Sequence, residues 1–397
     1  MNAIVLADEL TERLIKGRDT WWFLGPGGVA RIDAKHVMPD GRLQPAARDK
    51  LRELGLYTPV PFGSYSLTVL TSTDCNLGCG YCFQNTGQDL AGGNRPPRIE
   101  HARLTSQTIT SILEFGRRQM AAVGLDELRI MLFGGEPLLN PRGCVELLER
   151  AAGYGLKSAQ MISNLTLLTP ALAGKLSDLG LASVQVTFDG DRADHDRIRA
   201  RRSPGRTGTF DTIIRNMERA SLVSPLHWIL RVNVSHHTED GTGALVDRLA
   251  AALDPARCSL YFARIVDAEV GYVNDLAHTA EVAGRFGEWQ RQAIGLGFGV
   301  PRPGPDPICQ TCTYRGGRYG AVISADGTLS SCWDTAGKPD WQVGTITGGY
   351  FPDAEISGRW TGCAELFPQG PDADAVTAFN DLVDAALLDY LSDTGRL

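Results

Sequence analysis

Three cysteines are spaced closely enough in one short segment to hold an iron–sulfur cluster. Cys75, Cys79 and Cys82 form a C-x3-C-x2-C pattern directly after an apolar stretch. Cysteine thiolates are the usual ligands of such clusters, and three of them bind three irons of a cubane, which leaves the fourth iron open to a small molecule. A structural zinc site is the alternative, but closed zinc sites use four ligands, and no fourth cysteine lies near this segment. The spacing therefore predicts an open [4Fe–4S] site.

Further motifs follow the cysteines in order. They are FGGEP at 133–137, ISN at 162–164, VTFDG at 186–190 and HDRIR at 195–199. Together with the cysteines, spread over about 125 residues, this series resembles the radical S-adenosylmethionine (SAM) enzymes, and within them the subgroup with additional C-terminal clusters. Thr187 stands where serine is commoner in that subgroup, which keeps the hydroxyl group. His195 matches the family as well, with a structural contact within its loop as an equally good interpretation.

The resemblance implies a specific chemistry at the open iron. SAM chelates that iron through its amino and carboxylate groups, and the reduced cluster donates an electron that cleaves SAM to methionine and a 5′-deoxyadenosyl radical. The radical abstracts a hydrogen atom from an unactivated carbon. The cofactor supplies this chemistry, while the protein orients the reactants and excludes water and oxygen. A flavodoxin or ferredoxin is the expected electron donor.

The resemblance also implies which residues contact SAM. Tyr81 borders the adenine, and a glycine pair lets backbone approach the SAM amino group without interference from a Cβ atom. Ser163 and Thr187 are expected to hydrogen-bond the ribose or the methionine portion. Arg231 is expected to pair with the SAM carboxylate, with an inward-facing ion pair as the alternative. The full expected set is Tyr81, Gly134, Gly135, Glu136, Ser163, Asn164, Thr187 and Arg231.

Between residues 64 and 299 the chain alternates short apolar stretches with helical patterns. Strands are predicted over 66–71, 128–133, 159–163, 183–188, 228–234 and 259–265, and helices near 106–120, 145–152, 170–179, 210–220 and 243–253. This alternation predicts an α/β fold with a parallel sheet, and six units fit the partial (β/α)6 TIM-like barrel of the family. Ligand sites of parallel barrels form where the C-terminal strand ends meet. The motifs after the first four strands are therefore expected on one rim.

Three units are expected along the chain: an N-terminal α+β extension over 1–62, the radical SAM barrel over 63–300, and a C-terminal auxiliary-cluster domain over 301–397. In the first unit, helices are predicted over 5–15 and 45–56, with a hairpin over 21–32 that turns at GPGG. Trp21, Trp22 and Phe23 on this hairpin are interpreted as core, with a substrate-facing edge as the alternative. A closing helix is predicted over 375–391.

A second group of cysteines lies in the C-terminal region: Cys309, Cys312, Cys332 and Cys363. The stretch from Cys312 through Gly327 to Cys332 resembles the C-x9–15-G-x4-C signature of SPASM and twitch domains, built around a β-hairpin expected at 319–323 and 328–332. Four thiolates suffice for one auxiliary [4Fe–4S] cluster and not for two, so a twitch-like domain is expected. A zinc site made by the same four cysteines is the alternative.

Composition favours a cytoplasmic enzyme. A chain of 397 residues that is 43% hydrophobic can bury a large core. The net charge is −7, and Lys and Arg are scattered, so no nucleic-acid partner is expected. No signal peptide and no run of 18 apolar residues is present, which predicts no membrane association. Seven of the nine cysteines belong to the two groups, and Cys144 and Cys258 are expected to be small core residues.

The substrate is the least specified part of the sequence. Relatives with this organisation install crosslinks, thioethers or epimerised centres in ribosomally synthesised peptides, mature sulfatases, or act on sugars and small alcohols. The preferred hypothesis is a radical SAM enzyme that modifies a precursor peptide by oxidative bond formation. The alternative is a dehydrogenase or epimerase of a small molecule such as an aminoglycoside, or a sulfatase-maturating type of enzyme. A zinc-binding scaffold without catalysis is a third hypothesis, distinguished by its lack of visible absorbance.

Overall fold

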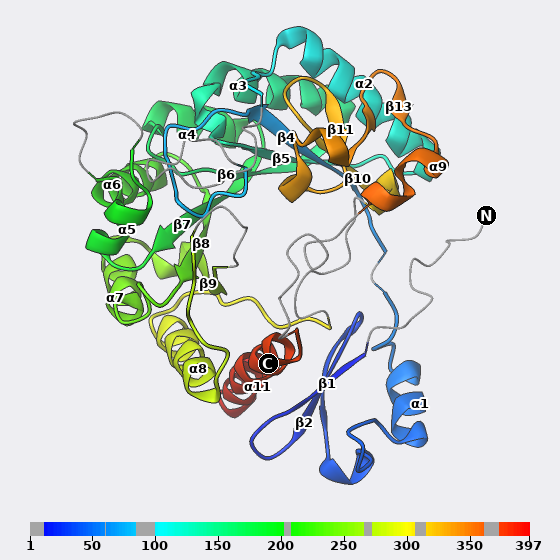
Figure 1. The fold of residues 1–397 in the computed structure, drawn as a ribbon, viewed down its shortest axis with the longest axis vertical. Coiled ribbons are helices and arrows are strands. Elements are labelled where there is room, and N and C mark those ends of the chain that lie inside the picture. Colours follow the sequence, from blue (N-terminus) through cyan, green and yellow to red (C-terminus); the bar gives the residue numbers. More distant parts are fainter. Residues whose placement is uncertain are drawn as a thin grey trace.

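A ten-stranded sheet forms the centre of the computed structural model (Figure 1). The structure describes residues 12–59, 61–84, 100–201, 208–265, 272–305, 315–360 and 373–397. The strand order is β13-β12-β11-β10-β4-β5-β6-β7-β8-β9. The strands β4 to β9 pair in parallel with their sequence neighbours. Within the described residues the sheet stays open, with β9 and β13 at its edges, which agrees with a partial barrel.

The six parallel strands and the helices that connect them occupy the predicted region. The strands are β4 (Tyr65–Ser72), β5 (Leu128–Gly134), β6 (Leu156–Ile162), β7 (Leu181–Asp189), β8 (His227–Val234) and β9 (Cys258–Arg264). The helices are α2 (Ser106–Val123), α3 (Pro141–Ala151), α4 (Pro170–Asp178), α5 (Arg192–Ile198), α6 (Phe210–Ser221), α7 (Thr242–Ala252) and α8 (Ala280–Gly295). In Figure 1 these helices lie on the outer side of a curved sheet. The predicted α/β architecture is confirmed, while α5 and α8 were not anticipated.

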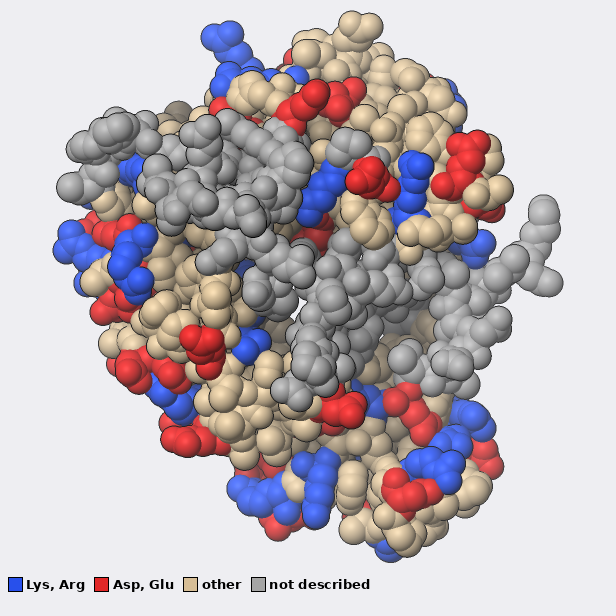
Figure 2. Space-filling model, viewed as in Figure 1, with Lys and Arg blue, Asp and Glu red and all other residues tan. Residues whose placement is uncertain are grey.

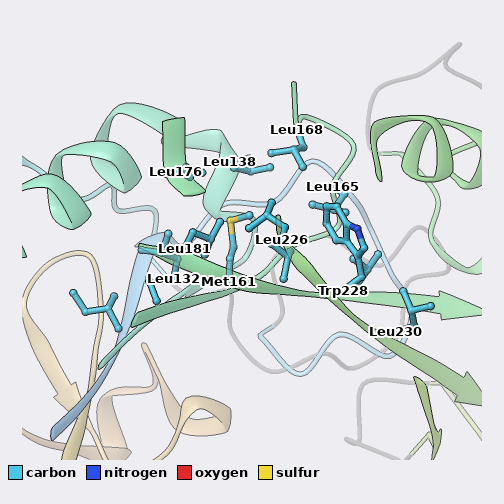
Figure 3. Packing of buried hydrophobic residues seen from close by; sticks show 14 of the residues in the cluster. Leu132, Leu138, Met161, Leu165, Leu168, Leu176, Leu181, Leu226, Trp228 and Leu230 are labelled. Atoms are coloured by element: carbon cyan, nitrogen blue, oxygen red, sulfur yellow. The ribbon is translucent and has the colours of Figure 1, made fainter. Parts of the chain in front are cut away.

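Alternation along the strands separates a packed outer face from an inner face. In β7 and β8 the side chains of Val184, Val186, Leu230 and Val232 are fully buried in one core cluster with residues of the surrounding helices. Figure 3 shows part of this cluster, which includes Met161 of β6, Trp228 of β8 and Leu176 of α4. Because successive side chains of a strand point to opposite faces, the residues between these apolar ones face inward. Cys144 and Cys258 are both buried in the core, as predicted.

The C-terminal region adds four short strands to the same sheet. These are β10 (Gly320–Ile323), β11 (Thr328–Ser330), β12 (Gln342–Thr345) and β13 (Gly349–Tyr350), followed by the short helix α9 (Asp353–Ile356). The hairpin β10–β11 was predicted, and Gly327 at its turn has a φ of +92°, a backbone conformation that favours glycine. β10 pairs in parallel with β4. The hairpin therefore extends the barrel sheet beside the strand that leads into the first three cysteines.

The N-terminal unit is held by the C-terminal helix. β1 (Arg13–Lys16), β2 (Trp21–Gly25) and β3 (Gly28–Ile32) form an antiparallel sheet, followed by α1 (Pro45–Glu53). Trp22 packs on Ala385 and Leu388 of α11 (Ala373–Asp393), and its indole N–H donates to Asp389 at 2.8 Å. Figure 1 shows β1–β3 next to α11. The hairpin and the closing helix are thus confirmed. Trp22 and Phe23 are core residues, and Trp21 is partly buried against the cluster that contains Phe23.

One prediction for this unit was wrong. The helix expected over 5–15 is contradicted where the structure describes the chain, because Arg13–Lys16 is the strand β1. Residues 5–11 lie outside the described residues. Pairing of this segment with β2 buries Ile15 beside Trp22, so tertiary contacts outweigh the local helix propensity. The division into units at 62 and 300 stays a prediction.

The surface gives two plain findings. On the face drawn in Figure 2, positive and negative side chains are interspersed, without a large patch of one sign among the described residues. No helix in the described part of the chain combines the length and apolar character needed to cross a membrane.

Candidate active site at the strand ends

The three-cysteine segment directly follows β4, at the C-terminal end of the strand. Cys79 is buried, and Cys75 and Cys82 are partly buried. The Cys75 sulfur accepts hydrogen bonds from the Leu77 backbone N–H at 3.4 Å and from Asn164 Nδ2 at 3.8 Å. Among the described residues no three Cys, His, Asp or Glu side chains are gathered tightly enough to hold one metal ion. A cubane cluster instead spreads its thiolates over separate irons, and donors aimed at sulfur suit its anionic ligands.

Two glycines bring the end of β5 against the cysteine loop. Gly134 has a φ of +135°, and a Cβ atom there would overlap the carbonyl oxygen of Ser72. A Cβ atom at Gly135 would overlap the Asp74 carbonyl oxygen and lie 2.7 Å from its carbon. The glycines are therefore required by close backbone packing, whatever ligand approaches them. Because Asp74 precedes Cys75, this packing fixes where the loop starts.

Glu136 links the ends of β5 and β6. Its buried carboxylate accepts from the Leu138 backbone N–H at 2.9 Å, from the Ser163 hydroxyl at 2.7 Å and from the Asn164 backbone N–H at 2.7 Å. Burial raises the pKa of this carboxyl, and the hydrogen bonds offset part of the rise. Both oxygens of Glu136 and the proton of Ser163 are thus used within the protein. This arrangement favours a scaffolding role for the two residues.

Asn164 connects the β6 end to the cysteine loop. Besides Cys75, its Nδ2 donates to Asn76 Oδ1 at 2.9 Å, and its Oδ1 accepts from the Thr166 backbone N–H and hydroxyl at 3.0 and 2.7 Å. The next residue, Leu165, has a φ of +56° and is fully buried. A left-handed conformation at a non-glycine residue is costly, so the surrounding bonds hold this turn against local strain. The turn aims the Asn164 amide at the sulfur.

Two predicted SAM contacts lie side by side on the inner face. Thr187 of β7 is in register with Arg231 of β8, and both are partly exposed. The Arg231 Nε donates to Asn233 Oδ1 at 2.8 Å, and its guanidinium lies 6.0 Å from the centroid of the Tyr261 ring. Among the described residues neither the other Arg231 nitrogens nor the Thr187 hydroxyl has a hydrogen-bond partner. The structure therefore does not pair Arg231 with a carboxylate of the described chain.

Tyr81 is tied to the ends of β7 and β8 by a largely buried polar network, here called the Tyr81 network: Tyr81, Asp189, Arg199 and Asn233. The Tyr81 hydroxyl donates to Asp189 at 2.8 Å and accepts from Arg199 at 2.7 Å and from Asn233 at 2.9 Å. Asn233 also donates to Asp189 at 3.2 Å. Burial raises the pKa of the Asp189 carboxyl, partly offset by the Arg199 cation. The network therefore joins the cysteine loop to the C-terminal ends of β7 and β8.

His195 has a structural role in this arrangement. It is fully buried, its Nδ1 accepts the Asp189 backbone N–H at 3.4 Å, and its Nε2 lies 3.1 Å from the Thr209 hydroxyl. Burial, with a smaller contribution from Arg199, lowers the pKa of the imidazole well below its usual value. The ring packs against those of Phe188 and Phe210, which also contact each other. The structural interpretation of this residue is thus the one its contacts favour.

The C-terminal hairpin brings one of the second-group cysteines close to the first group. Trp333, which follows Cys332, lies in an apolar cluster with Phe83, which follows Cys82. Its ring centroid is 5.9 Å from that of Phe133. Lys338 interacts electrostatically with Cys332 and Cys82, and burial lowers the pKa of its ammonium group. Cys309, Cys312 and Cys363 lie outside the described residues.

Comparisons with known proteins agree with this geometry. A sequence model of the radical SAM superfamily matches residues 69–249. The probable GTP 3′,8-cyclase of Methanopyrus kandleri is 31% identical over 293 residues, which are 69% of this chain and 83% of that protein. This chain belongs to the radical SAM superfamily.

Solved radical SAM structures share the fold. Native anSMEcpe with bound AdoMet superposes with a TM-score of 0.61 at 15% identity, over 84% of this chain and 100% of that one. Streptococcus suis SuiB bound to its precursor peptide SuiA gives a TM-score of 0.51 at 15% identity, over 80% of this chain and 71% of that one. At these identities the likeness concerns the fold. Membership of the superfamily implies a [4Fe–4S] cluster and SAM as cofactors.

Several residues that organise this radical SAM site were missed by sequence reasoning. Asn233 and Asp189 anchor Tyr81, and Asn76 with Thr166 supports Asn164. Asp189 lies within the VTFDG motif and Asn233 lies two positions after Arg231 on one strand. The alternation of side chains along β7 and β8 could have identified both residues. Asn233 lies two positions after Arg231 and therefore faces the same, inner side of the sheet. No local pattern pointed to Asn76 or Thr166.

Proposed function

We propose that this radical SAM enzyme modifies a ribosomally synthesised precursor peptide by oxidative bond formation. When bound at Cys75, Cys79 and Cys82, the cluster and SAM supply a hydrogen-abstracting radical. The observation that carries the oxidative part of the proposal is the shared apolar cluster of Trp333 and Phe83, which follow Cys332 and Cys82. A second cluster ligated from Cys332 is proposed to accept the electron that the substrate radical loses when the new bond forms.

The chain's own residues have distinct proposed roles toward SAM. Thr187 and Arg231 supply a hydroxyl and a guanidinium edge on the inner face, suited to the ribose or methionine portion and to the carboxylate. Tyr81 borders the adenine, with its ring held by the Tyr81 network. Gly134 and Gly135 expose backbone toward the amino group. Glu136, Ser163 and Asn164 hold the loops in place through their side chains and contact SAM through backbone atoms.

The auxiliary site is proposed to use Cys309, Cys312, Cys332 and Cys363 for one [4Fe–4S] cluster in a twitch-like domain. Four thiolates leave no open iron, so this cluster would transfer electrons or stabilise the structure instead of ligating substrate. A zinc site of the same four cysteines is the competing proposal. Iron and zinc analysis of the variant lacking Cys75, Cys79 and Cys82 separates them: about four residual irons support the cluster, and zinc without iron overturns it.

Peptide modification is supported by the fold likeness to SuiB, whose structure contains its precursor peptide. A decisive experiment co-expresses the enzyme with each short open reading frame beside its gene and measures peptide masses. Loss of two hydrogen atoms from one peptide, absent with the triple cysteine variant, is the expected result, because bond formation from two C–H or heteroatom–H groups removes two hydrogens. Unchanged peptides would overturn the proposal.

A small-molecule substrate is the second candidate. It is favoured by the relative in Methanopyrus kandleri, whose name describes a probable GTP cyclase. Turnover of GTP or of an amino sugar with SAM-dependent formation of 5′-deoxyadenosine, together with unchanged peptides, would establish this candidate. A product with the same mass as its substrate would also show that the oxidative assignment was wrong.

A further inference from the structure

The Tyr81 network contains a buried cation beside the cysteine loop. The Arg199 side chain is 11% exposed, and Asp189, its only carboxylate partner in the described chain, is fully buried at 3.4 Å. One Arg199 nitrogen, Nη1, donates to both the Tyr81 hydroxyl and the Asp189 carboxylate. The Nε atom is buried and has no hydrogen-bond partner among the described residues. A buried guanidinium with an unused N–H is costly unless its charge or that N–H serves another group.

The geometry directs this charge toward the cluster ligands. Arg199 contacts the hydroxyl of Tyr81, which lies between Cys79 and Cys82 in sequence. It also interacts electrostatically with the Cys79 thiol. Asp189 belongs to the same network but carries the opposite charge. One buried cation and one buried anion therefore lie beside the loop that holds the cluster.

We propose that Arg199 is a positioning residue that sets the reduction potential of the catalytic cluster. This inference rests on the cluster being bound by Cys75, Cys79 and Cys82. Reduction adds one electron to an already anionic cluster, and a nearby cation stabilises that added charge strongly where water is excluded. Arg199 thus makes the cluster easier to reduce, and Asp189 makes it harder. The guanidinium also holds the Tyr81 side of the loop at the strand ends.

Charge substitutions of opposite sign separate this electrostatic role from a purely structural one. Arg199→Met removes the cation, and Asp189→Asn removes the anion while keeping a hydrogen-bonding side chain. Tyr81→Phe is the matched control, because it removes the bridging hydroxyl and leaves both charges in place. Each variant would be reconstituted anaerobically and its midpoint potential measured by a redox titration that follows the electron paramagnetic resonance signal that changes on SAM addition.

The expected shifts are opposite in direction. Arg199→Met should lower the ratio of reduced to oxidised cluster about tenfold at a fixed potential, which is a shift of about 59 mV toward more negative values for a one-electron couple. Asp189→Asn should shift the potential in the positive direction, and Tyr81→Phe should shift it less than either. A wild-type potential in both charge variants with full iron content, or shifts of the same sign, would overturn the proposal.

Two further outcomes are distinguishable. If Arg199→Met does not retain iron, Asp189→Asn decides the question: a positive shift supports the proposal and an unchanged potential overturns it. If the wild-type protein itself shows no SAM-sensitive signal, or if removing Cys75, Cys79 and Cys82 leaves that signal intact, the cluster assignment has failed instead. Arg199→Lys, which keeps the charge and loses the planar fork, should keep a potential nearer to wild type than Arg199→Met does.

Discussion

Replacing Gly135 with alanine tests the packing that positions the cysteine loop. The added Cβ would overlap the Asp74 carbonyl oxygen and approach the Thr73 carbonyl oxygen to 3.0 Å. Forcing one methyl group into packed surroundings costs about 1–3 kcal/mol. Moving the Asp74 carbonyl would also break its 2.8 Å bond from the Glu136 backbone N–H, worth about 0.5–1.5 kcal/mol. The summed penalty is about 1.5–4.5 kcal/mol.

This penalty has two measurable consequences. If the loop moves, Cys75 shifts with Asp74, and the retention of iron or the affinity for SAM should fall by a factor of roughly 10 to 2,000. If the loop keeps its conformation, the free energy of unfolding of the apoprotein should instead fall by the whole penalty of about 1.5–4.5 kcal/mol. Iron and sulfide per chain, SAM titration and denaturant unfolding together report both.

The matched control is Gly284→Ala in α8. No heavy atom lies within 4 Å of the Cβ position at Gly284, and the residue is inside a helix. Alanine there should raise the free energy of unfolding by about 0.4–1 kcal/mol and leave iron and SAM binding unchanged. The reasoning is refuted if Gly135→Ala matches the wild-type protein in all three measurements while Gly284→Ala behaves as expected.

Three other predictions concern the site and its support. Thr187→Ala should weaken SAM binding about fivefold, the loss of one hydrogen bond of about 1 kcal/mol; an unchanged dissociation constant in a SAM titration would count against this contact. Replacing Cys75, Cys79 and Cys82 with alanine should abolish 5′-deoxyadenosine formation, and product at the wild-type level by chromatography would contradict the cluster assignment. His195 is neutral in the folded protein, with its pKa held well below 6.5 by burial. Because the unfolded chain takes up a proton there as the pH falls below about 6.5, stability should decrease by up to about 1.4 kcal/mol per pH unit in that range. His195→Gln should show a shallower decrease in denaturant unfolding between pH 7.5 and 5.5, and parallel slopes would show that the histidine is not responsible.

Local patterns in the sequence determined most of the fold. The six strands of the barrel and five of its helices were predicted close to their observed bounds. Each of these elements shows its apolar run or helical periodicity within its own residues, so no distant contact is needed to recognise it. The helix expected over 5–15 failed for the converse reason. Arg13–Lys16 is too short to show a period of its own, and its strand pairing with β2 is decided by contacts elsewhere in the chain.

The candidate site divides in the same way. Sequence alone predicted the proposed ligand set Cys75, Cys79 and Cys82, because three cysteines within eight consecutive residues must lie close together whatever the fold. Only the tertiary structure decided how that loop is held. The bonds of Tyr81 to Asp189 and Arg199 join residues 108 and 118 positions apart, and hydrogen bonds over such separations leave no periodic trace in the sequence. They exist because parallel strands carry their C-terminal ends to one edge of the sheet.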